Sequence, residues 1–220
     1  YYLVEAKAPT GYTIADPVHF RLDAEGMVWI IDENGDETLA ADKTAVMEDT
    51  PTEIKISKVD FYGTGEELED ARLQILDAET EDVATTIYYV DDENTPDEKL
   101  EWVSGSEPKV IQGLPAGDYI LRETDAPDGY TIAEDIRFTI TDELKLEADT
   151  ITMTNMPIDV TISKVDITGR QELEGAFLEI RDKETGELAV TEYGDTLAWV
   201  SNGTPKNIKG LAAGTYILRE

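Results

Sequence analysis

Short segments in which apolar and polar residues alternate recur along the chain. The alternation has a period of two in residues 53–60, 72–77 and 136–141, which is typical of half-buried antiparallel strands. Turn residues separate these segments, and Asn34-Gly35 between two apolar stretches predicts a two-residue β-hairpin. Few segments have a helical period. The pattern therefore predicts an all-β fold built of β-sandwiches.

Several sequence motifs recur along the chain. Residues 56–60 (ISKVD) return as residues 162–166, and residues 119–130 (YILRETDAPDGY) have a counterpart in residues 1–12 (YYLVEAKAPTGY). Each phrase holds the same place in a unit of roughly one hundred residues, which is the sequence signature of a repeat architecture.

The repeats divide the chain into three units with short joints. We expect residues 1–50 (the first unit) to be the C-terminal part of a domain and residues 51–157 (the middle unit) to be a complete domain. Residues 158–220 (the third unit) then form the N-terminal part of another domain. Pro51 and Pro157 mark the joints, and the next strand begins directly after each proline. Joints this short favour a stiff string of domains.

Three polar side chains of the middle unit lie in the phase of an apolar strand face. Residues two apart share a face of a strand, so Lys58 lies on the same face as Ile54 and Ile56. Glu123 and Asn155 follow apolar residues on their own strands in the same way. The middle unit is therefore predicted to bury a lysine, a glutamate and an asparagine on three different strands.

Burial of such groups is costly, and two interpretations follow. An unpaired ammonium or carboxylate in a core costs several kcal/mol even after relaxation. The three side chains could form a buried Lys–Glu ion pair with the asparagine hydrogen-bonded to it. Alternatively, desolvation could lower the pKa of the lysine and raise that of the glutamate, which would leave a neutral, nucleophilic amine beside a carboxylic acid.

The other two units carry parts of the same pattern. Glu5 and Asp49 lie in the first unit at the positions of the glutamate and the asparagine. Asp49 is predicted to share a strand face with Ala45 and Met47. The third unit has Lys164 and Glu220, both predicted to face inward, and no acceptor follows within these residues.

Composition excludes several classes of function. The chain has 220 residues, a formal net charge of −31, no cysteine and one histidine. Affinity for nucleic acid or anionic lipid depends on Lys and Arg, so neither partner is expected. The lack of cysteine excludes disulfides and thiolate metal sites. The single histidine nearly excludes a Ser-His-Asp triad. The acidic segment that starts at Asp32 has Glu37 where a calcium loop needs its glycine and Lys43 where it needs its bidentate glutamate, so neither metal nor cofactor is expected.

The repeated motifs carry a family resemblance. Ile-Ser-Lys-Val-Asp, Tyr-Ile-Leu-Arg-Glu-x-x-Ala-Pro-x-Gly-Tyr and Met-Thr-Asn-x-Pro together closely resemble the Cna protein B-type (SpaA-like) domains of Gram-positive surface proteins and pilins. The resemblance covers the whole chain. It implies tandem prealbumin-like, immunoglobulin-related β-sandwiches, in which the lysine and asparagine are joined by a self-generated isopeptide bond that the glutamate promotes.

The residues fit that implied chemistry. We hypothesise that Lys58 attacks the side-chain amide of Asn155, while Glu123 hydrogen-bonds the carbonyl, stabilises the oxyanion and shuttles protons as ammonia leaves. Such a domain reacts once, so enzyme activity is not expected. In the first unit, Asp49 in place of asparagine would release water instead of ammonia.

The resemblance implies a structural module in an extracellular, cell-wall-anchored protein of a Gram-positive bacterium. Its expected partners are neighbouring domains of the same parent protein, with no membrane insertion in this segment. The alternative is an adhesin domain that binds a host protein or glycan, with the host extracellular matrix as a further partner, and an exposed apolar or aromatic patch would favour it. A hydrolase would need two carboxylates facing each other across a cleft, and the sequence indicates no such pair.

Overall fold

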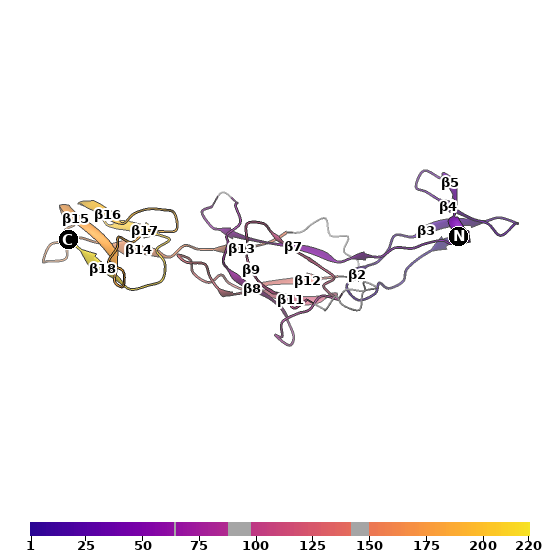
Figure 1. Cartoon of the computed structure of the whole chain (residues 1–220), viewed down its shortest axis with the longest axis horizontal. Helices are drawn as coiled ribbons and strands as arrows, with labels where there is room; N and C mark the ends of the chain where they lie inside the picture. The colour runs from indigo at the N-terminus through magenta and orange to yellow at the C-terminus, as the bar shows by residue number, and fades with distance from the viewer. Residues whose placement is uncertain (64, 88–97, 142–149) are drawn as a thin grey trace.

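The molecule is elongated, and its strands form three successive groups. The structure is a computed structural model that describes residues 1–63, 65–87, 98–141 and 150–220. The middle unit lies between the first unit and the third, which sit at opposite ends (Figure 1). The predicted all-β fold is confirmed, because the helix found in the described residues is a short 3-10 turn, η1 (Ala41–Lys43).

The middle unit contains two sheets. One has the strand order β10-β7-β13, and the other has the order β12-β11-β8-β9. The alternation of residues 53–60 and 72–77 predicts the bounds of β7 and β8 correctly. The strands are β7 (Glu53–Asp60), β8 (Arg72–Asp77), β9 (Glu101–Val103), β10 (Lys109–Gln112), β11 (Gly117–Asp125), β12 (Ile136–Ile140) and β13 (Thr150–Asn155).

Apolar side chains from the two sheets form one core between them. Each strand contributes every second residue, as period-two alternation requires. The core is continuous across the gap between the sheets, so the middle unit is a sandwich. Its buried members include Ile54, Ile56, Ile111 and Met153 from one sheet, and Leu73, Ile75, Tyr119, Leu121 and Ile140 from the other.

Strand pairing in the middle unit is antiparallel except at one place. The first strand, β7, pairs with the last strand, β13, in parallel, with Lys58 opposite Met153 and Asp60 opposite Asn155. The pairing places Lys58 and Asn155 near the same end of neighbouring strands.

The third unit repeats the arrangement of the first five strands of the middle unit. It has one sheet with the order β14-β17 and another with the order β16-β15-β18. These sheets correspond to the β7-β10 and β9-β8-β11 pairings. The strands are β14 (Asp159–Ile162), β15 (Glu174–Asp182), β16 (Ala198–Asn202), β17 (Lys206–Lys209) and β18 (Tyr216–Arg219).

The first unit has a four-stranded sheet, β1-β3-β4-β5, and a separate pair, β2-β6. The predicted final strand across Ala45, Met47 and Asp49 is wrong, because residues 44–49 form no strand. A partner equivalent to β7 would have to pair with them, and the first unit supplies none. Its strands are β1 (Tyr2–Leu3), β2 (Tyr12–Thr13), β3 (Val18–Leu22), β4 (Val28–Ile31), β5 (Glu37–Leu39) and β6 (Thr50–Pro51).

The hairpin between β4 and β5 differs from the predicted two-residue turn. Residues 32–36 separate the two strands. The Asp32 carboxylate accepts hydrogen bonds from the backbone N–H groups of Asn34 and Asp36, at 2.9 and 2.8 Å. A short acidic side chain at the first position of a loop often bonds its own backbone in this way, and here it stabilises the longer loop.

Candidate functional site

The three polar residues predicted to face inward are all buried. The exposed fractions are 1% for Lys58, 3% for Glu123 and 0% for Asn155. Each lies on a strand whose inward positions are otherwise apolar, on β7, β11 and β13 respectively. The fold therefore brings a potential nucleophile, a carboxyl group and an amide together inside the sandwich.

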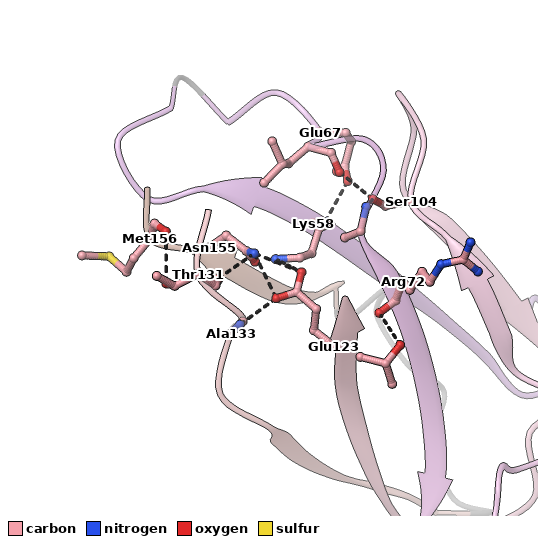
Figure 2. A network of polar contacts seen from close by, with 12 residues as sticks. Lys58, Glu67, Arg72, Ser104, Glu123, Thr131, Ala133, Asn155 and Met156 are labelled. Atoms are coloured by element: carbon pink, nitrogen blue, oxygen red, sulfur yellow. Dashed lines mark hydrogen bonds and ion pairs between the residues drawn. The ribbon is translucent and has the colours of Figure 1, made fainter. Parts of the chain in front are cut away.

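These side chains point toward one another from both sheets (Figure 2). The Nζ of Lys58 lies 3.5 Å from the Oε1 of Glu123, which is longer than a hydrogen bond of good geometry. The Nδ2 of Asn155 donates to both carboxylate oxygens of Glu123, at 3.0 and 2.9 Å. The carboxylate thus lies within reach of both the amine and the amide nitrogen.

Two loop backbone groups orient this set. The carbonyl of Thr131 accepts a hydrogen bond from Asn155 Nδ2 at 3.0 Å, and the N–H of Ala133 donates to Glu123 Oε2 at 2.6 Å. Sequence alternation did not identify either residue, because both act through the backbone of a loop. These two hydrogen bonds restrict the orientation of the Glu123 carboxylate and of the Asn155 amide.

The amide orientation differs from the hypothesis drawn from sequence. The nitrogen of Asn155, and not its carbonyl oxygen, faces Glu123. The physical reason is that the carboxylate and the Thr131 carbonyl are both acceptors, so only the NH₂ end of the amide can satisfy them. Among the described residues, Asn155 Oδ1 and Lys58 Nζ have no hydrogen-bond partner.

Burial changes the protonation of the lysine. Desolvation lowers the pKa of Lys58 below its ordinary value, and the attraction of Glu123 only partly opposes this effect. A lower pKa raises the fraction of neutral amine at a given pH. A neutral amine has a free lone pair and is a nucleophile.

A further carboxylate positions the strand that carries Lys58. Glu67 accepts hydrogen bonds from the Ser57 hydroxyl at 2.6 Å and from the Lys58 backbone N–H at 2.8 Å. The same contact recurs in the third unit, where the Lys164 N–H donates to Glu172 at 3.1 Å. The sequence signal for this role was the Glu-Leu-Glu-x-Ala phrase that follows each Ile-Ser-Lys-Val-Asp.

The first unit keeps one element of the site. Glu5 accepts a hydrogen bond from the Ala15 N–H at 2.7 Å, as Glu123 does from Ala133. Asp49 is half-buried on the segment without strand pairing. In the described part of the chain, no hydrogen bond joins Glu5 to Asp49.

The third unit brings its two predicted residues together near the surface. Lys164 Nζ lies 3.1 Å from Glu220 Oε2, with side-chain exposures of 28% and 60%. The prediction that Glu220 is buried is therefore wrong. Its counterpart Glu123 is covered by β13, and the third unit has no equivalent strand within these residues.

Neither a metal site nor a membrane-spanning element is found in the described residues. No group of three or more His, Asp or Glu side chains is placed to hold a metal ion there. Over the same ranges, no helix has the length and apolar character needed to cross a membrane.

Comparison with protein families identifies the fold. The family model described as the SpaA prealbumin-like fold domain matches residues 52–155 and again residues 158–220. The chain belongs to this family. The two SpaA matches cover the residues that carry the Lys58, Glu123 and Asn155 set and its partial copy in the third unit. A search among curated proteins gave no match.

The matches among solved structures include pilins. A streptococcal ancillary pilin is 19% identical, with a TM-score of 0.38, and the match covers 92% of this chain and 71% of that protein. The minor pilin GBS52 of Streptococcus agalactiae is 18% identical, with a TM-score of 0.38 and 63% coverage of each chain. The TIE protein of Bacillus anthracis is 15% identical, with a TM-score of 0.37, and the match covers 90% of this SpaA-family chain and 40% of that protein.

Proposed function

We propose that this chain is a segment of a structural stalk or pilus-like rod on the cell wall of a Gram-positive bacterium. Membership of the SpaA family, the repeated units and their end-to-end arrangement support this role. Its partners are then the neighbouring domains of the same parent protein. Residues 51–157 act as a complete domain in this proposal, while residues 1–50 and 158–220 belong to the domains before and after it.

The proposal includes an isopeptide bond between Lys58 Nζ and Asn155 Cγ. The single observation that carries it is the burial of Lys58, Glu123 and Asn155 against one another. Burial of an ordinary ion pair is costly and gives little net stability, so a chemical use explains the set better than a structural one.

The reaction balances without any further reactant. The Nζ lone pair of Lys58 attacks Cγ of Asn155, and the bond from Cγ to Nδ2 breaks. One proton leaves the amine and reaches Nδ2, which departs as ammonia. Glu123 carries that proton, because its carboxylate lies 3.5 Å from Nζ and 2.9 and 3.0 Å from Nδ2, and it ends in its starting state.

This geometry favours the proton shuttle over the oxyanion role for Glu123. The leaving nitrogen, Asn155 Nδ2, donates hydrogen bonds to the Glu123 carboxylate and to the Thr131 carbonyl. Glu123 therefore contacts the atom that must receive the proton, and not the carbonyl oxygen that becomes the oxyanion. Folding supplies the proximity, which can lower a barrier by roughly 7 to 11 kcal/mol. Each chain reacts once, so the process is self-maturation and not enzyme turnover.

The mass of the folded chain tests this proposal. We expect the purified protein to be lighter than its sequence by one ammonia. The Lys58→Ala variant should have the full mass. A folded wild-type chain of full mass would overturn the crosslink, and a mass loss that persists in Lys58→Ala would assign it to another residue. The adhesin alternative is not proposed for this chain, because membership of the SpaA family supports the structural role.

A further inference from the structure

Equivalent backbone hydrogen bonds hold both joints of the chain, the one after Pro51 and the one after Pro157. At the first joint, the Thr52 N–H donates to the Gly11 carbonyl at 2.9 Å, and the Gly113 N–H donates to the Thr52 carbonyl at 2.8 Å. The Ile87 N–H then donates to the Gly113 carbonyl at 2.8 Å. Three consecutive backbone hydrogen bonds therefore connect the turn at Gly11 in the first unit to the loops at Gly113 and Ile87 in the middle unit.

The second joint repeats this series position by position. The Ile158 N–H donates to the Gly129 carbonyl at 2.7 Å, and the Gly210 N–H donates to the Ile158 carbonyl at 2.9 Å. The Glu192 N–H donates to the Gly210 carbonyl at 2.9 Å. Side chains differ between the two joints, with threonine at one and isoleucine at the other, so the backbone geometry is the shared feature.

Glycines make this close approach possible. Gly11 and Gly129 lie in the Ala-Pro-x-Gly-Tyr turns at φ of 83° and 80°, a region that favours glycine. A Cβ on Gly11 would lie 2.9 Å from the Gly113 carbonyl oxygen, and one on Gly129 would lie 2.8 Å from that of Gly210. Real Cβ atoms do not approach a backbone oxygen so closely, so each turn fits against the next unit only without a side chain.

Side chains add further contacts at the second joint. The Asp60 carboxylate of the middle unit accepts a hydrogen bond from the Tyr193 hydroxyl of the third unit at 2.8 Å, and another from Tyr130 at 3.3 Å. Lys209 Nζ lies 3.7 Å from the ring centroid of Tyr62, across the same joint, in cation–π geometry. The Tyr193 and Lys209 contacts join the same two units as the glycine contact, so they add to the resistance of this joint to bending and rotation.

We propose that the Ala-Pro-x-Gly-Tyr turn is a docking element that locks each unit against the next in one fixed orientation. Its partner is the glycine–leucine turn of the following unit, at Gly113-Leu114 and Gly210-Leu211. Both leucines are buried, which anchors the receiving turn in its own core. The partner that this surface fits is another prealbumin-like domain that begins directly after the joint proline and carries such a turn.

Distances between spin labels can test the fixed orientation. The chain has no cysteine, so Glu79→Cys and Ile167→Cys introduce the only two thiols, both at exposed positions in different units. We expect pulsed electron spin resonance to give one narrow distance distribution. Gly129→Ala should widen it, whereas Gly186→Ala, at a φ of 73° with open space around its Cβ, should leave it unchanged.

The possible results distinguish the docking role of the turn from a general effect of glycine substitution and from the crosslink. A broad distribution in the parent chain, or equal widening by Gly129→Ala and Gly186→Ala, would overturn the docking role. If Gly129→Ala fails to fold, as circular dichroism would show, Tyr193→Phe provides the test, because it removes only the hydroxyl that reaches Asp60 and should still widen the distribution. Lys58→Ala should keep the narrow distribution, so a failure of the crosslink leaves this proposal standing.

Discussion

Replacing Glu123 with glutamine should block the crosslink while preserving the shape of the site. The amide is isosteric with the carboxylate, but it cannot accept a proton from Lys58 Nζ and pass it to Asn155 Nδ2. Both oxygens of Glu123 contact that nitrogen in the native chain. We therefore expect Glu123→Gln to retain the full mass of its sequence.

The stability change can be worked out from the loop that the bond closes. Lys58 and Asn155 are 97 positions apart, nearly the whole middle unit. By analogy with a disulfide that closes about 100 residues, the bond stabilises the folded state by about 4.7 kcal/mol in the chain-entropy treatment. For a domain of this size, that loss lowers the melting temperature on the order of 20 °C or more.

Urea unfolding followed by tryptophan fluorescence measures this difference. Glu123→Gln also leaves the Lys58 amine buried without its carboxylate, which adds a cost of its own. The double variant Lys58→Met/Glu123→Gln removes the charge as well as the bond. Its free energy of unfolding, compared with that of the crosslinked chain, isolates the contribution of the loop.

Two results would refute this reasoning. A Glu123→Gln chain that still lacks one ammonia by mass would show that Glu123 does not carry the proton. A crosslinked chain and an uncrosslinked double variant that unfold at the same urea concentration would show that the bond does not constrain the unfolded chain as a loop of this length should.

Two further predictions concern Lys58 and the residues around it. In Asn155→Ala, which cannot crosslink, burial lowers the pKa of Lys58 in the folded chain, so the unfolded chain binds more protons between that lowered pKa and about 10.4. Its free energy of unfolding, relative to Asn155→Ala/Lys58→Met, should rise with pH across this range, and a fall in urea titrations would contradict the direction of the shift. Glu67→Ala removes the acceptor for both Ser57 and the Lys58 N–H, so it should destabilise the middle unit by about 2 kcal/mol or more and slow the appearance of the ammonia-loss mass. A crosslinking rate equal to that of the parent chain would show that Glu67 does not position Lys58.

Period-two alternation predicted much of the middle unit because its strands each have one buried face. The bounds of β7 and β8 follow from it, as does the burial of Lys58, Glu123 and Asn155. A polar residue in the apolar phase of a strand is visible in the sequence alone.

Features that depend on long-range pairing or on loop backbone were not predicted. The exposure of Glu220 and the absence of a strand at residues 44–49 depend on whether a partner strand covers them, which local alternation does not report. The orientation of the Asn155 amide depends on the Thr131 carbonyl, and no side-chain pattern marks a backbone acceptor. The hydrogen bonds of the Asp32 side chain stabilise a five-residue loop at residues 32–36, whereas the Asn-Gly pair predicted a two-residue turn.

The parallel pairing of β7 with β13 determines how the chain grows as repeats are added. Two parallel neighbours run in the same direction, so the chain enters the middle unit at the start of β7 and leaves at the far end of β13. An antiparallel pair would return the exit to the entrance and fold successive repeats back on each other. With the parallel pair, each additional repeat extends the molecule by at least the length of β7, about 26 Å for eight residues. A protein built of such repeats would therefore lengthen linearly with their number, while its width would stay that of one sandwich.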